Sequence, residues 1–318
     1  MSRRYREADL ARIRTVPIAG RTARVTPADC ATPPGPERSF HAFLDSLPRT
    51  LAADHLRQVA AAIVSAQRAG RGVLAMVGGH VIKTGLGPLL GHWVRRGIVS
   101  HVALNGAAAI HDYELARFGA TSEDVAAGLQ DGSFGMAEET GAEMNRAIRD
   151  AAAAGRGMGE GLAQALAGAP STPGAAASVL AACHALGVPV TVHPSIGTDI
   201  IHQHPSADGG ALGETGHRDF RRLAGAMPDL HQGGVVLNFG SAVVLPEVFL
   251  KALTVARNLD QGRPTGFLAA DFDMIRHYRP RVNVVERPTA PHGTGLLLTG
   301  HHEILIPLLA WAVEDLSS

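Results

Sequence analysis

Two lysines are the first candidates for chemistry in this sequence. Of the 29 basic residues, all but Lys83 and Lys251 are arginine. A neutral lysine amine attacks carbonyl and imine carbons, so either lysine is a candidate for covalent catalysis. Lys251 follows Glu247 by four residues, a spacing that places both side chains on one face of a helix. An ordinary solvated ion pair is therefore the alternative interpretation of Lys251.

Glycine and polar residues follow an apolar segment at residues 72–77. Gly79, Lys83, Thr84 and Gly85 all lie within the next eight residues. Glycine-rich turns at the carboxyl ends of parallel strands let the backbone approach a phosphate, so this segment is a candidate phosphate-binding turn. It matches neither the GxGxxG fingerprint nor a Walker loop, and an ordinary strand-to-helix turn is the alternative.

The same arrangement recurs after two further apolar segments, at residues 100–104 and 188–192. Asn105 and Gly106 follow the first, and a loop with Thr198 and Asp199 follows the second. Other polar residues nearby are His111, Asp112, Glu114, His193 and Gly197. Because the carboxyl ends of parallel strands meet at one edge of a sheet, three such loops together predict a shared ligand site.

Histidines support a rival interpretation. The chain has 16 histidines, and several of them fall near the predicted strand ends. The sequences His202-x-His204 and His301-His302-Glu303 contain side chains that bind zinc or a similar ion. No HExxH motif accompanies them. A metal-dependent hydrolase is therefore an alternative, although the ligand pattern is not specific.

The elements that would position these residues begin at about residue 50. From there, helix-length and strand-length apolar segments alternate, which is typical of a parallel sheet with crossover helices. The predicted strands are 72–77, 100–104, 188–192, 234–237, 266–270, 282–285 and 295–298. The predicted helices are 51–69, 87–96, 108–118, 137–154, 173–186, 219–226, 246–258 and 304–316, the fifth capped by Thr172. We predict a doubly wound α/β fold with a mostly parallel sheet and helices on both faces.

Composition and charge narrow the class of protein. Apolar residues make up 46% of the 318 residues, and 29 basic residues balance 29 acidic ones, which favours a globular protein without a nucleic-acid partner. No signal peptide or apolar stretch of membrane-spanning length is evident, and the two cysteines are far apart. We expect a cytoplasmic protein with no membrane partner. Residues 1–48 are predicted to form an N-terminal arm, and residues 49–318 a single domain.

Several of these segments resemble deoxyhypusine synthase and its bacterial relatives. Residues 79–85 are similar to the Ser/Thr-Gly cofactor turn of that family, and residues 105–114 to its second, acid-containing cofactor turn. Cys183-His184 resembles the family's Ala-His helix end, and Val188-Pro189-Val190 its Ile-Pro-Val strand. Thr198-Asp199 matches a Thr-Asp pair that follows, and residues 303–310 resemble the closing helix.

The resemblance implies an NAD-dependent transferase that moves an aminobutyl group from spermidine, a polyamine, to an acceptor amine. In the family, NAD takes a hydride from spermidine and later returns it to an imine. A lysine carries the four-carbon fragment in between, and such a lysine must be neutral to attack. The family's Glu-Ala-x-Ser-Trp-Gly-Lys segment is absent, and Lys251 beside Glu247 is the nearest candidate. His184 takes the place of an active-site acid or base.

These arguments lead to one set of predicted site residues. The residues expected to bind NAD are Gly79, Thr84, Gly85, Asn105, Gly106, Asp112, Thr198 and Asp199. The expected catalytic residues are Lys251, His184 and Glu247, and no metal is assigned. By resemblance we expect a homotetramer, and the acceptor is a protein lysine, a free polyamine or another amine. A relative that binds NAD but has lost the transferase chemistry is the remaining alternative.

Overall fold

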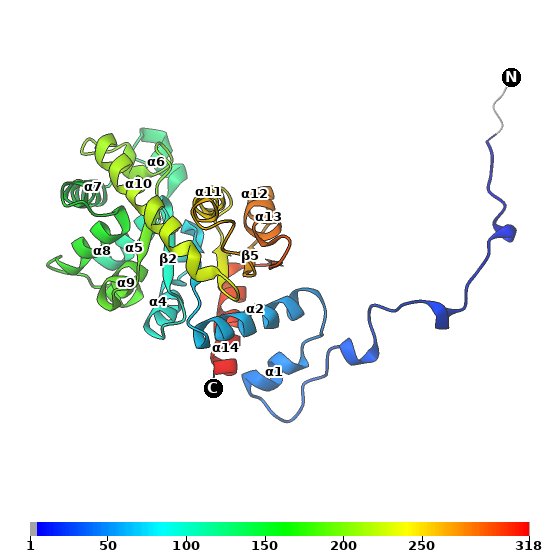
Figure 1. The fold of residues 1–318 in the computed structure, drawn as a ribbon. Helices are drawn as coiled ribbons and strands as arrows, with labels where there is room; N and C mark the ends of the chain where they lie inside the picture. Colours follow the sequence, from blue (N-terminus) through cyan, green and yellow to red (C-terminus); the bar gives the residue numbers. More distant parts are fainter. Residues whose placement is uncertain (1–4, 318) are drawn as a thin grey trace, which may run out of the picture.

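The computed structural model describes residues 5–317 and contains a six-stranded sheet (Figure 1). Its strands are β1 (Val73–Val77), β2 (His101–Asn105), β3 (Val190–His193), β4 (Val235–Phe239), β5 (Leu268–Asp273) and β6 (Thr294–Thr299). Their spatial order is β3-β2-β1-β4-β5-β6, and every neighbouring pair is parallel. The predicted doubly wound α/β fold is confirmed.

Helices cover both faces of this sheet. The longer ones are α2 (Leu51–Arg68), α4 (Gly87–Arg95), α5 (Gly106–Phe118), α7 (Glu138–Ala153), α8 (Met158–Ala167), α9 (Val179–Leu186), α10 (Gly209–Ala226), α11 (Val244–Leu259) and α14 (His302–Ser317). Shorter ones are α1 (Phe40–Ser46), α3 (Gly79–Lys83), α6 (Val125–Asp131), α12 (Tyr278–Pro280) and α13 (Arg287–Thr289). Because both faces are covered, the strands are short runs of buried apolar residues rather than alternating ones.

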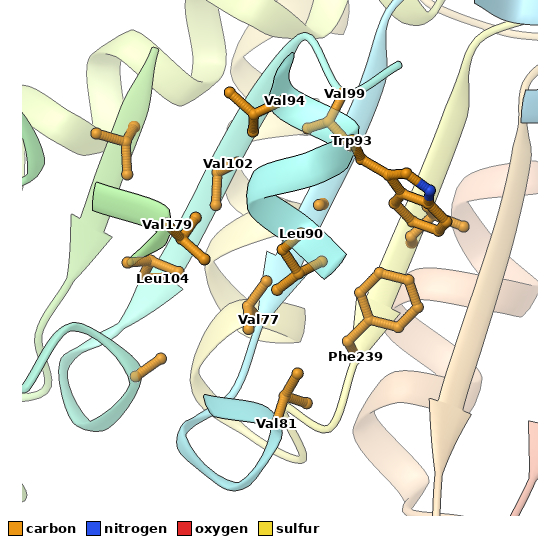
Figure 2. Close-up of a cluster of buried hydrophobic side chains, with 14 of the residues drawn as sticks. Val77, Val81, Leu90, Trp93, Val94, Val99, Val102, Leu104, Val179 and Phe239 are labelled. Carbon is orange, nitrogen blue, oxygen red and sulfur yellow. The ribbon is translucent and has the colours of Figure 1, made fainter. Parts of the chain in front are cut away.

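Side chains of each strand alternate between two hydrophobic cores. In β1, Val77 packs into the larger core with α2, α4, α5, α9 and α14, whereas Met76 packs into a smaller core with α10 and α11. Figure 2 shows part of the larger core, where Trp93 of α4 lies against Phe239 of β4 with ring centroids 6.2 Å apart. The two cores fix the sheet between its helix layers, which also fixes where each strand ends.

One predicted strand is wrong. Residues 282–285 belong to a π-helical segment, η7 (Arg281–Glu286), between α12 and α13. Val282, Val284 and Val285 are buried there against the smaller core and its surroundings. A short run of β-branched residues has the composition of a buried strand and of a buried helical turn alike, so periodicity alone does not separate the two.

Two predicted helix starts also move. The helix expected from residue 173 begins at Val179, because Ser178 is its N-cap and accepts a hydrogen bond from the Ala181 amide. The helix expected from residue 219 begins ten residues earlier, after its N-cap Asp208. Glycines in its first turns hid the start, since glycine is a poor helix former.

The predicted arm divides into two parts. Residues 5–39 are almost entirely exposed and carry only short 3₁₀ turns. Figure 1 shows the first part of this segment extending away from the body, whereas the Thr32 amide donates to the Ser46 carbonyl and the Arg49 amide to the Asp29 carbonyl. Helix α1, by contrast, packs against α14, with the rings of Phe40 and Trp311 5.7 Å apart and Leu44 buried. Arg57 of α2 donates hydrogen bonds to the carbonyls of Leu44 and Leu47. The body therefore begins near residue 40 rather than residue 49.

No helix within residues 5–317 is both long enough and apolar enough to cross a membrane.

Candidate active site at the carboxyl edge of the sheet

A cavity of about 530 Å³ opens at the carboxyl ends of β1, β2 and β3. Its polar lining comes from the loops and helices that follow these strands, and it comprises Lys83, His111, Glu114, Thr121, Ser122, Glu123, Thr198 and Asp199. Ala107, Ile110, Phe118 and Phe134 are among the apolar residues that complete it. The structure thus brings together three loops that lie far apart in the sequence, at the edge where such folds bind ligands.

Asp199 is the most constrained side chain in this cavity. A Cβ atom added to Gly106 would lie 1.9 Å from Asp199 Oδ2, so only glycine fits beneath the carboxyl group. Oδ1 lies 3.4 Å from the Thr198 hydroxyl, whereas Oδ2 is buried without a hydrogen-bond partner. Gly106 is the first residue of α5, so the carboxylate lies at the positive end of a 13-residue helix.

Charges of both signs line the cavity. Burial raises the pKa of Asp199 to about 6. Burial, with a smaller contribution from the nearby charge of Lys83, lowers the pKa of His111 to about 4. Glu114 accepts hydrogen bonds from the hydroxyls of Thr121 and Thr140 and is held in place by them. At neutral pH the cavity therefore presents carboxylates, one ammonium group and a neutral imidazole.

A second polar group lies at the carboxyl ends of β1 and β4, where the strand order reverses. A Cβ on Gly78 would lie 2.3 Å from the carbonyl oxygen of Gly240, so the two loops touch through their backbones. His302 is 1% exposed, and its Nε2 lies 3.2 Å from the Phe272 carbonyl, to which it donates. Its Nδ1 is therefore an acceptor, and it is buried without a partner. The His80 ring lies 5.7 Å from that of His302.

The predicted cofactor residues fall mainly along this edge. Thr198 and Asp199 line the cavity, and a Cβ on Gly79 would lie 2.9 Å from that of Ala107, another lining residue. Asn105 accepts a hydrogen bond from the Ala108 amide and so caps α5. Thr84 ends α3, and Gly85 follows with a φ of +82° and open space around it. Contact of these residues with NAD stays a prediction.

Asp112 does not point into the site. It is 1% exposed, and its carboxylate accepts hydrogen bonds from the Ser178 hydroxyl and from the amides of Val179 and Leu180. These groups form the amino end of α9, so the side chain joins α5 to α9. Its place after β2 suggested a ligand contact, but on α5 its side chain is buried in the core.

The structure does not bring the three predicted catalytic residues together. His184 lies in the last turn of α9 and lines a separate cavity with His101 and Pro189, which lie at the amino ends of β2 and β3. That is the opposite edge of the sheet from Asp199. Lys251 and Glu247 form an ion pair on α11, with 57% of the lysine side chain exposed. Neither lines the cavity, and α5 and α11 belong to different cores.

The remaining histidines are dispersed. His204 hydrogen-bonds to Ser206, and His301 lies 3.7 Å from Glu303 on the surface. Within residues 5–317, no group of three or more His, Cys, Asp or Glu side chains is arranged to hold a metal ion.

Several residues at this edge of the sheet were not among the predicted site residues, including Lys83, His202, His80 and His302. Lys83 was singled out in the sequence as one of two lysines in the chain and as part of the turn after β1, but it was not assigned to the site. His202 lies three residues after Asp199, a weak signal of a shared face. His80 and His302 are distant in sequence, and tertiary packing alone brings their rings within 5.7 Å of each other.

Comparisons with known proteins support the fold. No family model matches the sequence, and no curated protein matches it either. A structure of an Entamoeba histolytica protein assigned as a deoxyhypusine synthase matches 88% of this chain and 95% of its own, with 8% identity and a TM-score of 0.51. A conserved Methanococcus maripaludis S2 protein assigned to the LOR/SDH group matches 85% and 71%, with 16% identity and a TM-score of 0.51.

A third neighbour contains a dinucleotide. The ternary complex of AgrE with ornithine and NAD⁺ matches 83% of this chain with 16% identity and a TM-score of 0.53, and this chain spans 33% of AgrE. At such identities these matches show the fold alone. The chain has a deoxyhypusine synthase-like α/β fold, one that it shares with enzymes, including an NAD⁺-bound one.

Proposed function

We propose that this protein is an NAD-dependent enzyme whose cofactor lies along the carboxyl edge of β3, β2, β1 and β4. The observation that carries the proposal is the cavity at the carboxyl ends of β1, β2 and β3, with Asp199 and Lys83 in its lining. In doubly wound folds the dinucleotide crosses the crevice where the strand order reverses, and an acid in the first half of the sheet accepts from a ribose hydroxyl.

The residues present fit this cofactor. Asp199 lines the cavity, where its Oδ1 would accept from ribose hydroxyls. The Lys83 ammonium would complement the diphosphate. Close contact between Gly78 and Gly240 narrows the crevice toward His302. When bound, NAD would accept a hydride from a substrate carbon and return it to an imine.

The substrate class we propose is a cationic amine. The specific substrate we propose is spermidine, whose aminobutyl group passes to an acceptor amine. Asp273 lies beside His302, with Oδ1 3.8 Å from Nε2, and provides a carboxylate for a substrate ammonium at the crevice. The unpartnered Nδ1 of His302 is the proton acceptor we propose in place of His184. If the transfer is covalent, a lysine amine displaces 1,3-diaminopropane from the oxidised spermidine and holds the four-carbon fragment as an imine.

A trapping experiment tests the proposal, because the chain offers two lysines that serve as each other's control. The protein is incubated with NAD and spermidine, NADH is followed by absorbance, and adducts are reduced with borohydride and mapped by mass spectrometry. We expect bound NAD and a four-carbon adduct on one lysine that disappears in Lys83→Arg or in Lys251→Arg, but not in both.

The outcomes separate the alternatives. NADH formation without an adduct means simple oxidation of the amine, which overturns the aminobutyl transfer and keeps the NAD enzyme. NAD binding without NADH formation from any polyamine leaves a cofactor-binding relative and overturns the enzyme. If the protein does not bind NAD, the whole proposal is wrong.

A further inference from the structure

Asp199 and His202 form a buried pair at the edge of the cavity. Their side chains are 5% and 6% exposed, and His202 Nε2 lies 3.7 Å from Asp199 Oδ2. Both atoms are buried and have no hydrogen-bond partner. Unpaired buried polar atoms are costly, so two that face each other across less than 4 Å require an explanation.

The backbone fixes which nitrogen of His202 carries the proton. The Gly197 amide donates to His202 Nδ1 at 3.1 Å, so Nδ1 is an acceptor. A neutral imidazole with an acceptor at Nδ1 carries its hydrogen on Nε2. Burial lowers the pKa of His202, which keeps the ring neutral at physiological pH. The nitrogen that carries the hydrogen is therefore the one that lies 3.7 Å from Asp199 Oδ2.

The pair has room to close. A separation of 3.7 Å exceeds a hydrogen bond, and a shift of less than about 1 Å brings the two atoms into bonding range. A ligand that donates a hydrogen bond to Oδ1 would orient the carboxyl group, and Oδ2 would then accept a hydrogen bond from His202. An ionised carboxyl accepts from both sides, whereas a protonated one does not.

We infer that His202 is a positioning residue that holds Asp199 ionised for the ribose diol of NAD and thereby disfavours the phosphorylated ribose of NADP. This rests on the proposed NAD site. A neutral N–H donor favours the charged form of the carboxyl group without adding a positive charge that would attract a phosphate. The fixed carboxylate then repels the additional phosphate of NADP at close range.

Other titratable groups line the same cavity as Asp199 and must be held constant in a test. They are Lys83 from α3, His111 and Glu114 from α5, and Glu123 from the loop before α6. Among residues 5–317, only His202 combines an unpartnered N–H with a side chain buried beside Oδ2. Substitution of His202 therefore isolates the N–H group from the surrounding charges.

The first arm of the experiment needs no cofactor. The pKa of Asp199 is measured by ¹³C NMR of aspartate-labelled protein, with Asp199→Asn to assign the signal. In His202→Phe, which keeps a ring but removes the N–H, we expect the pKa to rise by roughly one unit. His202→Gln restores an N–H donor and should bring the value back. His184→Gln, an exposed histidine at the opposite edge, is the matched control and should change nothing.

The second arm measures NADH and NADPH binding by fluorescence at pH 6.0 and 8.0. We expect His202→Phe to weaken NADH binding about fivefold at pH 6.0 and hardly at all at pH 8.0, where Asp199 is largely ionised in both proteins. Asp199→Asn should narrow the preference for NADH over NADPH. A merely structural role of His202 would weaken binding equally at both pH values.

The two arms distinguish the possible failures. If the wild type binds neither dinucleotide, the proposed cofactor site is wrong, and NMR still decides whether His202 controls Asp199. If NADH binds but the pKa of Asp199 is the same in the wild type, His202→Phe and His202→Gln, the inference is overturned and the cofactor site stands. Equal affinity of the wild type for NADPH and NADH overturns the selectivity.

Discussion

At the scale of single residues, the site depends on how closely side chains approach backbone. Gly106 and Asp199 were predicted as site residues because each follows a strand, and the structure shows that they are also in contact. Their positions were predictable because strand ends in a parallel sheet share an edge. The contact between them was not predictable, since a sequence does not show which loop packs against which helix.

That contact gives a prediction with a matched control. Gly106→Ala would place a Cβ 1.9 Å from Asp199 Oδ2, so the carboxyl group must move. We expect a loss of about 1–3 kcal/mol in the free energy of unfolding, measured in urea, and weaker NADH binding. Gly213→Ala, in the interior of α10 with nothing within 4 Å of its Cβ, should stabilise the protein by about 0.5–1 kcal/mol. A Gly106→Ala protein with wild-type stability and affinity would contradict the contact.

The catalytic residues were the least predictable part of the site. Lys251 and Glu247 do pair at the spacing of four that suggested an ion pair, and their exposure agrees with that alternative. The ring of His302 faces Asp273 only because β5 and α14 meet at the same edge. Such proximity arises from tertiary packing and leaves no local pattern in the sequence.

At the scale of elements, side chains that join two helices explain where those helices begin. Six of the seven predicted strands are present, since buried parallel strands are short apolar runs bounded by glycine and proline. The start of α9 was displaced from residue 173 to Val179 because Asp112 binds the amides at that end. A cap supplied from another helix is invisible to local sequence patterns.

Substitution of Asp112 therefore distinguishes a structural role of this residue from a role in cofactor binding. Asp112→Ala leaves the Ser178 hydroxyl and two amides of α9 without their buried acceptor. We expect the free energy of unfolding to fall by about 3 kcal/mol in urea titrations. NADH affinity of the folded variant should stay close to that of the wild type. Loss of NADH binding at unchanged stability would instead restore Asp112 to the cofactor site.

At the scale of the whole molecule, the N-terminal segment has two different relations to the body. Residues 5–39 contribute no buried core residue, whereas Leu44 of α1 joins the larger core and Phe40 packs against it. We expect deletion of residues 1–38 to leave the urea midpoint unchanged. Deletion of residues 1–48 should lower the free energy of unfolding by about 2 kcal/mol or more, since it removes both apolar side chains. Equal midpoints for the two deletions would show that α1 does not stabilise the body.

The fold class was predictable because it depends on the succession of apolar segments, which the sequence displays directly. The strand order was not predicted, since it depends on which segments pair across long stretches of chain. Strand β1 pairs with β2, the next strand in sequence, and also with β4, which follows β3. That second pairing brings the loops after β1 and β4 together beside His302, so this part of the site was not predictable from local sequence patterns.

The pairing of β1 with β4 also sets an order of events during translation. A nascent chain that has completed β3 already contains every strand beside the cavity, yet β1 still lacks its second neighbour. Until the ribosome has delivered β4, the backbone amides and carbonyls along one side of β1 are open to any other strand. The half of the molecule that holds Asp199 and His202 is thus synthesised first, but one side of β1 stays unpaired until β4 follows.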